Sequence, residues 1–155
     1  MELFTIAREG RGTLSTMAMP AAYDELATLA EAGADRVVCL LPEPEADELG
    51  LADEESAARA AGLAFRRLPV VDFGVPDVDA ARELVDEVAA ALADGEHVVI
   101  HCRGGIGRSS VVAAAVLVAE GASPEEAWSR LAAARGFPVP ETDEQRAFVG
   151  IIADN

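Results

Sequence analysis

The stretch VVIHCRGGIGRSSVVAAAVLV, residues 98–118, joins two apolar runs through a short glycine-rich loop. The first run has the length of a strand and the second the length of a helix, which predicts a buried strand at 97–101 and a helix at 108–119. His101 and Cys102 come where the strand ends. Ligands of open α/β sheets bind at the carboxyl ends of strands, so this loop is the place to look for a site.

Further apolar runs alternate with segments of helical spacing along the rest of the chain. Residues 10–20 are expected to lead into the first helix, and an acidic stretch of helical spacing runs to Gly62. This alternation predicts an α/β fold with a central, mostly parallel sheet flanked by helices. A length of 155 residues suits one domain, 1–155. The expected strands are 3–7, 36–41 and 65–71; the expected helices are 21–32, 78–93, 124–135 after Ser123, and a last helix capped by Thr142.

The composition excludes several classes of partner. The net charge is −16, and all 12 basic residues are arginine, which argues against binding to nucleic acids or to membrane surfaces. No run reaches the ~18 apolar residues of a membrane span, and the first residues lack the pattern of a signal peptide. Two cysteines are too few for a secreted disulfide scaffold. We therefore expect a cytoplasmic protein.

The glycine loop has the composition of an anion site with a nucleophile. If the loop curls into the helix that begins near Arg108, its backbone N–H groups converge on one point. Arg108 can then hold two oxygens of a tetrahedral anion, with Cys102 beneath its centre. A helix N-terminus and a nearby cation favour the thiolate, which is the nucleophilic form. The residues expected around the anion are Arg103, Gly104, Gly105, Ile106, Gly107 and Arg108.

Two neighbours of the loop have a chemical and a purely structural interpretation. His101 is expected to orient the loop through hydrogen bonds, or to be an ordinary buried histidine. Ser109 can donate its hydroxyl to the Cys102 sulfur, or simply begin the helix. Other glycine-loop and metal sites do not fit, because the chain has no lysine for a nucleotide P-loop and no cysteine–histidine spacing typical of zinc sites.

HCRGGIGRSS resembles the HCxxGxGRS signature of the cysteine-dependent protein tyrosine and dual-specificity phosphatases. LPVVDFGVPD before the loop, and the segment from SPEEAW to ETDEQ after it, are most similar to the kinase-associated phosphatase branch and its bacterial relatives. The resemblance implies the protein tyrosine phosphatase-like fold, a phosphocysteine intermediate and no metal or organic cofactor.

The resemblance also implies an aspartic acid that protonates the leaving group, in the pattern D-x-x-x-P. Asp72 with Pro76 fits this pattern. Asp77 stays as the alternative, although it also suits the N-cap of the following helix.

Two further positions follow from the resemblance, and two arginines follow from the strand pattern, all with open alternatives. Gln145 is expected either to position the hydrolytic water or to complete a capping box with Thr142. Cys39 is expected either to form a reversible disulfide with Cys102 or to be a small core residue. Because a strand alternates faces, one of Arg66 and Arg67 is expected to point outward. An ordinary solvated or salt-bridged arginine is the favoured interpretation, and attraction of an anionic substrate is the alternative.

These residues predict a phosphatase that acts on phosphotyrosine in proteins, with phosphoserine and phosphothreonine as further substrates. The alternative is a phosphatase of phosphoinositides or other small phosphates with the same mechanism. A rhodanese-type sulfurtransferase and a non-catalytic phosphate-binding module are less favoured, because the separate acid and the full loop are both present. The expected partner is a phosphorylated protein or peptide, and the sequence gives no indication of an oligomeric state.

Overall fold

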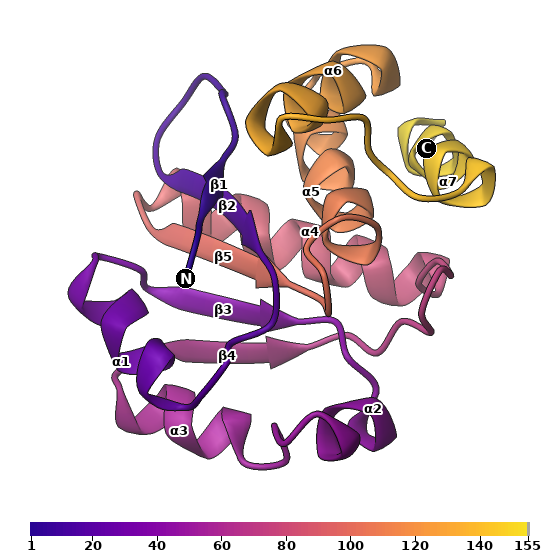
Figure 1. Ribbon diagram of the computed structural model, residues 1–155. Helices are drawn as coiled ribbons and strands as arrows, with labels where there is room; N and C mark the ends of the chain where they lie inside the picture. The colour runs from indigo at the N-terminus through magenta and orange to yellow at the C-terminus, as the bar shows by residue number, and fades with distance from the viewer. Residues whose placement is uncertain (155) are drawn as a thin grey trace.

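A five-stranded sheet forms the centre of the computed structural model, which describes residues 1–154 (Figure 1). In chain order its strands are β1 (Phe4–Thr5), β2 (Thr13–Met17), β3 (Arg36–Cys39), β4 (Ala64–Arg67) and β5 (His97–His101). They lie in the order β1-β2-β5-β3-β4. β1 is antiparallel to β2, and the other neighbours pair in parallel. The predicted α/β fold with a mostly parallel sheet is therefore confirmed.

Helices cover both faces of this sheet (Figure 1). On one face α1 to α3 pack over an apolar core, and on the other face α4 to α7 pack over a second one. In the part of the chain that the structure describes, no helix has the length and apolar character needed to cross a bilayer. The helices are α1 (Asp24–Glu31), α2 (Glu43–Glu48), α3 (Glu54–Ala60), α4 (Val78–Ala93), α5 (Arg108–Ala119), α6 (Pro124–Arg135) and α7 (Asp143–Ala153).

The middle residues of β3 and β5 are apolar because both faces of these strands are buried. In β3, Val37 and Cys39 belong to the core beneath α1 to α3, whereas Val38 and the following Leu40 belong to the core beneath α4 to α7. Side chains of a strand alternate between the two faces. In β5 the same alternation brings Cys102 to the core that contains Leu40. Cys39 and Cys102 therefore lie on opposite faces of the sheet.

Two expectations about strands were wrong. The first strand is only Phe4–Thr5, and Thr13–Met17, which we expected to be a connection, is a buried strand beside β5. Its hydroxyl residues obscure the strand pattern in the sequence. Inside the sheet the Ser15 hydroxyl has a hydrogen-bond partner, because Ser15 Oγ lies 2.9 Å from His97 Nε2. β2 lies beside β5, and its last residue, Met17, borders the loop that follows Cys102.

Two other boundaries also differ. β4 ends at Arg67 rather than at Val71, because Pro69 has no N–H for a sheet ladder. The chain still runs beside β3, since Val70 N donates to Leu40 O at 3.0 Å. The acidic stretch forms two helices, α2 and α3, separated at Gly50, whose φ of 77° favours glycine.

Candidate active site

Cys102 lies directly after β5 and lines a pocket of about 260 Å³. Its side chain is almost fully buried at 2% exposure. The sulfur lies 3.4 Å from the Ser109 hydroxyl in the first turn of α5, which agrees with the predicted contact. The pocket is lined by Asp72, Phe73, Cys102, Arg103, Gly104, Ile106, Arg108 and Glu141.

The loop from Cys102 to Arg108 is held in a tight curl that demands glycine. Gly105 has φ 72°, and a Cβ on it would lie 2.7 Å from the backbone carbon of Met17 at the end of β2. Arg103 O accepts from Met19 N at 3.0 Å, and Gly105 O accepts from Arg135 Nε at 3.1 Å. The loop is therefore fixed from two sides, by the chain after β2 and by α6.

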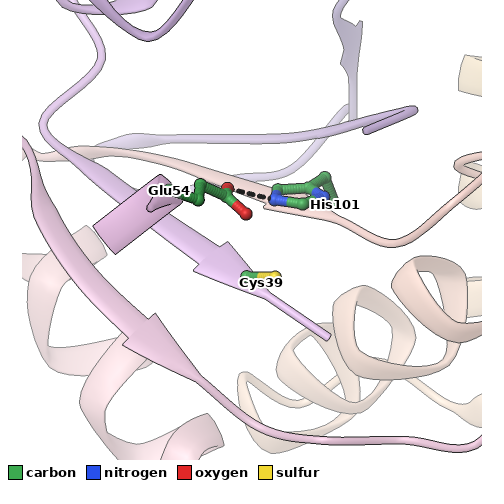
Figure 2. A group of neighbouring side chains, drawn as sticks. All are labelled: Cys39, Glu54 and His101. Carbon is green, nitrogen blue, oxygen red and sulfur yellow. Dashed lines mark hydrogen bonds and ion pairs between the residues drawn. The ribbon is translucent and has the colours of Figure 1, made fainter. Parts of the chain in front are cut away.

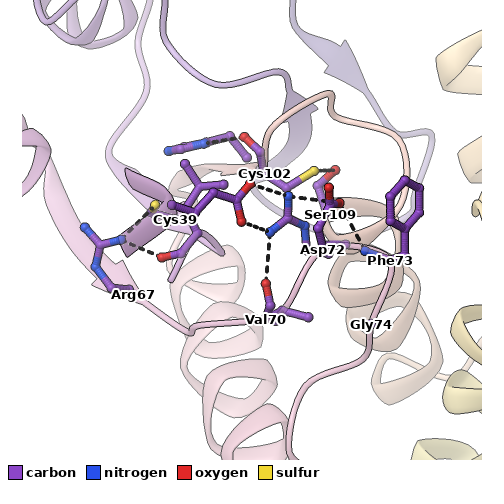
Figure 3. A network of polar contacts seen from close by, with 12 residues as sticks. Cys39, Arg67, Val70, Asp72, Phe73, Gly74, Cys102 and Ser109 are labelled. Carbon is purple, nitrogen blue, oxygen red and sulfur yellow. Dashed lines mark hydrogen bonds and ion pairs between the residues drawn. The ribbon is translucent and has the colours of Figure 1, made fainter. Parts of the chain in front are cut away.

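Arg108 is the buried cation of the site, with 2% exposure. Its guanidinium donates to both oxygens of Glu45, at 2.8 and 3.0 Å, and to Val70 O at 2.9 Å (Figure 3). Burial opposes the charge on Arg108, but the hydrogen bonds that it donates to Glu45 and the negative groups around it together raise its pKa. In return, the hydrogen bond from Arg108 lowers the pKa of Glu45. Our sequence reasoning missed Glu45, although it follows the carboxyl end of β3, the same edge as Cys102.

Asp72 and Asp77 occupy different environments. Asp72 Oδ1 lies 3.2 Å from Arg108 Nη2 and accepts from Phe73 N at 3.0 Å, so its carboxyl faces the pocket (Figure 3). Asp77 is the N-cap of α4 and accepts from Ala80 N at 3.0 Å. Asp72 lines the same pocket as Cys102, whereas Asp77 is a helix cap.

Gln145 is buried in a capping box rather than free in the pocket. Its Oε1 accepts from Glu141 N and Thr142 N at 2.9 and 3.2 Å, and Thr142 Oγ1 accepts from Gln145 N. Its Nε2 donates to Gly74 O at 3.2 Å and so ties α7 to the Asp72 loop. Both ends of the amide are therefore engaged within the fold.

Glu141 is a pocket carboxyl that sequence reasoning missed. Its Oε1 lies directly where a Cβ on Gly107 would be, which explains the glycine at the start of α5. Partial burial, and then the negative charge of Asp72, raise the pKa of Glu141. The sequence offered one sign of this role: Glu141 is a carboxylate residue only four positions before Gln145.

His101 and Cys39 lie together on the face of the sheet opposite the Cys102 side chain. His101 Nδ1 lies 3.0 Å from Cys102 O, so the predicted orienting hydrogen bond is present. Cys39 pairs with His101 in the sheet register and accepts from Arg67 Nη1 at 3.4 Å. Both thiols are free. The structure does not bring Cys39 to Cys102, so the geometry gives no support to a disulfide between them.

The side chains of Cys39, Glu54 and His101 are the one group of metal-ligand type found among residues 1–154, with donor atoms within 4.8 Å of one another. The donor set would suit zinc. However, Arg67 places a positive charge against the Cys39 sulfur, and His101 Nε2 is hydrogen-bonded to Glu54. These contacts describe a buried ion pair better than a cation site.

The arginines considered as substrate attractors have other partners. Arg66 pairs with Glu87 of α4 at 3.0 Å, and Arg67 donates to Leu41 O at 2.6 Å. Neither lines the pocket, whereas Arg103 is exposed at its rim.

Comparisons with known proteins agree with this geometry. Residues 11–122 match the family model described as "Polymorphic toxin system, DSP-PTPase phosphatase". Cyclin-dependent kinase inhibitor 3 of Rattus norvegicus is 35% identical over 86 residues, which are 54% of this chain and 41% of that protein. The chain therefore matches less than half the length of this relative.

Two solved structures share the fold. A kinase-associated phosphatase with its catalytic cysteine replaced by serine superposes with a TM-score of 0.92 at 22% identity, over 99% of this chain and 94% of that one. PTPMT1 in complex with PI(5)P gives a TM-score of 0.76 at 23% identity, over 94% and 92%. The predicted dual-specificity phosphatase fold is thus confirmed.

The Arg108–Glu45 pair predicts a pH-dependent loss of stability on Glu45→Gln. The pKa of Glu45 is lower in the folded state than in the unfolded chain, so the Glu45 carboxylate stabilises the fold at pH values above its unfolded-state pKa. This stabilisation disappears as the pH falls through the lower, folded-state pKa. We expect the variant to lose about 2 kcal/mol of unfolding free energy at pH 7 and much less at a pH below the lowered pKa of Glu45, measured by urea denaturation.

Glu87→Gln provides the matched control, since it breaks the exposed pair with Arg66. Its cost should be at most about 0.5 kcal/mol at either pH. Equal losses for the two variants at pH 7 would contradict a special role for the Glu45 pair.

Proposed function

Because the chain belongs to the DSP-PTPase phosphatase family of polymorphic toxin systems, we propose that it hydrolyses phosphotyrosine in proteins, with phosphoserine and phosphothreonine as further substrates. The reaction proceeds through a phosphocysteine at Cys102. The convergence of Cys102, Arg108 and Asp72 on one pocket carries this proposal. Each residue supplies one requirement of phosphoryl transfer: a nucleophile, a clamp for the oxygens and an acid for the leaving group.

In the first step the Cys102 thiolate attacks phosphorus, and the bond from phosphorus to the substrate oxygen breaks. The loop N–H groups and the Arg108 fork hold the three other oxygens. Asp72 gives its proton to the departing phenolate or alkoxide. Since Asp72 lies 3.2 Å from Arg108 in the free enzyme, the acid is already at the pocket before a substrate binds.

In the second step a water molecule attacks phosphorus, and the phosphorus–sulfur bond breaks. Asp72, now a carboxylate, takes one proton of the water, and Ser109 donates to the thiolate that leaves. We assign the second hydrogen of the water to Glu141, whose carboxylate accepts a hydrogen bond from it. This assignment replaces Gln145 in the role, because the amide of Gln145 is engaged by Gly74, Glu141 and Thr142.

The preference for phosphotyrosine rests on Phe73. Its ring is 57% exposed and lines the pocket that contains Cys102 (Figure 3). Phe73 lies in the loop that carries Asp72, and its φ of 63° is unusual for a non-glycine residue. An aromatic ring at this rim can stack on a phenyl phosphate but gains little from a serine phosphate.

The substrate is a protein rather than a membrane lipid in this proposal. A net charge of −16 opposes approach to an anionic bilayer, where basic clusters provide the attraction. We place the enzyme in the cytoplasm, which keeps its two free thiols reduced.

The first test is hydrolysis of p-nitrophenyl phosphate by reduced protein in the presence of EDTA. We expect activity in the wild type, none in Cys102→Ser, and a loss of about 10²- to 10⁴-fold in Asp72→Asn. Asp77→Asn is the control and should retain activity. An inactive, folded wild type would refute the phosphatase proposal unless phosphoinositides are hydrolysed, which would change the substrate class instead.

The role of Phe73 predicts a substrate-dependent effect of Phe73→Ala. The KM for a phosphotyrosine peptide should rise about fivefold, the loss of one aromatic contact, while the KM for the matched phosphoserine peptide changes less than twofold. Ile151→Ala removes a comparably exposed apolar side chain outside the pocket and should change neither value. Equal changes for both peptides would exclude ring stacking.

The role of Glu141 predicts that Glu141→Gln slows the second step alone. Rapid mixing with p-nitrophenyl phosphate should show an undiminished burst of p-nitrophenolate, followed by steady turnover about tenfold slower than in the wild type. Phosphocysteine should accumulate and be trapped by acid quench. If Gln145→Ala accumulates phosphocysteine and Glu141→Gln does not, the water belongs to Gln145.

A further inference from the structure

A buried acid–histidine pair lies behind the nucleophile, on the far face of the sheet. Glu54 at the start of α3 and His101 at the end of β5 each have 0% exposure. Glu54 Oε2 lies 2.5 Å from His101 Nε2 (Figure 2). The other ring nitrogen, Nδ1, lies 3.0 Å from Cys102 O. The ring thus connects α3 directly to the backbone of Cys102.

The partners of the ring determine where its protons are. Cys102 O can only accept, so Nδ1 must carry a hydrogen. At Nε2 the pair is either an imidazolium with a carboxylate or a neutral ring with a protonated acid. Burial alone disfavours the imidazolium, but contacts with Cys39 and with the Glu54 carboxyl raise the pKa of His101 well above its usual value. The ion pair is therefore the favoured form.

Among the groups around the ring, Glu54 is the one carboxyl that contacts it in the part of the chain that the structure describes. Cys39 of β3 is the second titratable group that faces it, and Arg67 of β4 lies on the far side of the Cys39 sulfur. The residue of β2 paired with His101 is Met17, which carries no charge. Glu54 is the acid that faces His101, and its removal would leave the imidazolium without a counter-charge.

The Glu54–His101 pair is not explained by its contribution to the free energy of unfolding alone. Glu54 Oε1 is buried without a hydrogen-bond partner, and an unpaired buried oxygen costs free energy. Buried ion pairs often stabilise a fold no better than apolar residues of the same size. A costly buried acid that touches the residue before the nucleophile is better explained by an effect on that nucleophile.

We propose that Glu54 is a positioning residue for Cys102. Its carboxylate fixes the His101 ring as a doubly protonated imidazolium whose Nδ1–H holds the Cys102 carbonyl, so that the nucleophile's backbone is locked and its thiolate is favoured. Glu54 acts only through His101 and touches no substrate. The proposal rests on the nucleophilic role of Cys102 proposed above.

The test is alkylation of Cys102 by iodoacetamide, followed by peptide mapping because Cys39 is also a free thiol. In Glu54→Gln we expect the alkylation rate to fall at least fivefold at pH 6 and to stay within twofold of the wild type at pH 9. Glu55→Gln, which removes a charge from the exposed surface of the same helix, should match the wild type at both pH values. A structural defect alone would change the two rates together.

Wild-type alkylation rates in Glu54→Gln at both pH values, or a uniform change at both, would overturn the proposal. Alkylation needs no phosphatase activity, so its outcome is separable from the failure of the proposed reaction. If Glu54→Gln does not fold, the ring nitrogens of the reduced wild type answer the question by nitrogen-15 NMR.

The chain has two histidines, and burial lowers the pKa of His97, which makes His97 an internal reference for a neutral ring. We expect both nitrogens of His101 to be protonated from pH 6 to pH 8, while His97 carries one proton at neutral pH. A singly protonated His101 at pH 7 would overturn the proposal whatever the variants show.

Discussion

The buried guanidinium of Arg108 is the constraint on which the site depends. A charge at 2% exposure is tolerated only when it is paired and hydrogen-bonded. Its partners come from separate places in the chain: Glu45 from α2, Val70 from the segment after β4, and Asp72 from the loop before α4. Satisfying one arginine therefore positions the helix beside the pocket, the loop of the acid and the start of α5 at once.

The same requirement is met a second time on the other face of the sheet. His101 is the last residue of β5, and its partner Glu54 belongs to the helices that cover the opposite core. The end of β5, just before Cys102, is therefore held by the buried His101–Glu54 pair on one face of the sheet. On the other face, the pair that the buried Arg108 forms with Glu45 lies beside the pocket. Under the proposed function, we expect the two pairs to hold the loop in place before a phosphate binds, so that binding needs little reorganisation.

The sequence predicted those parts of the site whose information is local. The loop, its strand and its helix lie within residues 98–118, and Asp72 is marked by the nearby Pro76. Glu45, Glu54 and Glu141 were missed because each joins the site through the fold rather than through a motif. That Cys39 faces away from Cys102 depends on the register that pairs Cys39 with His101, which only the fold supplies. Periodicity predicted the fold, but not β2, whose buried hydroxyl residues do not look like a strand, nor the division of the acidic stretch into α2 and α3.

Under the proposed function, the acidic exterior and the start of α5 act differently on a ligand. The net charge of −16 repels polyanions at a distance, whereas Arg108 and the α5 N-terminus favour one anion at contact. Screening confines the exterior field to about one Debye length, so a single phosphate on a neutral or basic polypeptide meets mainly the attractive part. A phosphate within an anionic surface meets the repulsion first. For the proposed phosphatase, the acidic surface therefore disfavours anionic surfaces as substrates, which the Cys102 loop alone cannot do.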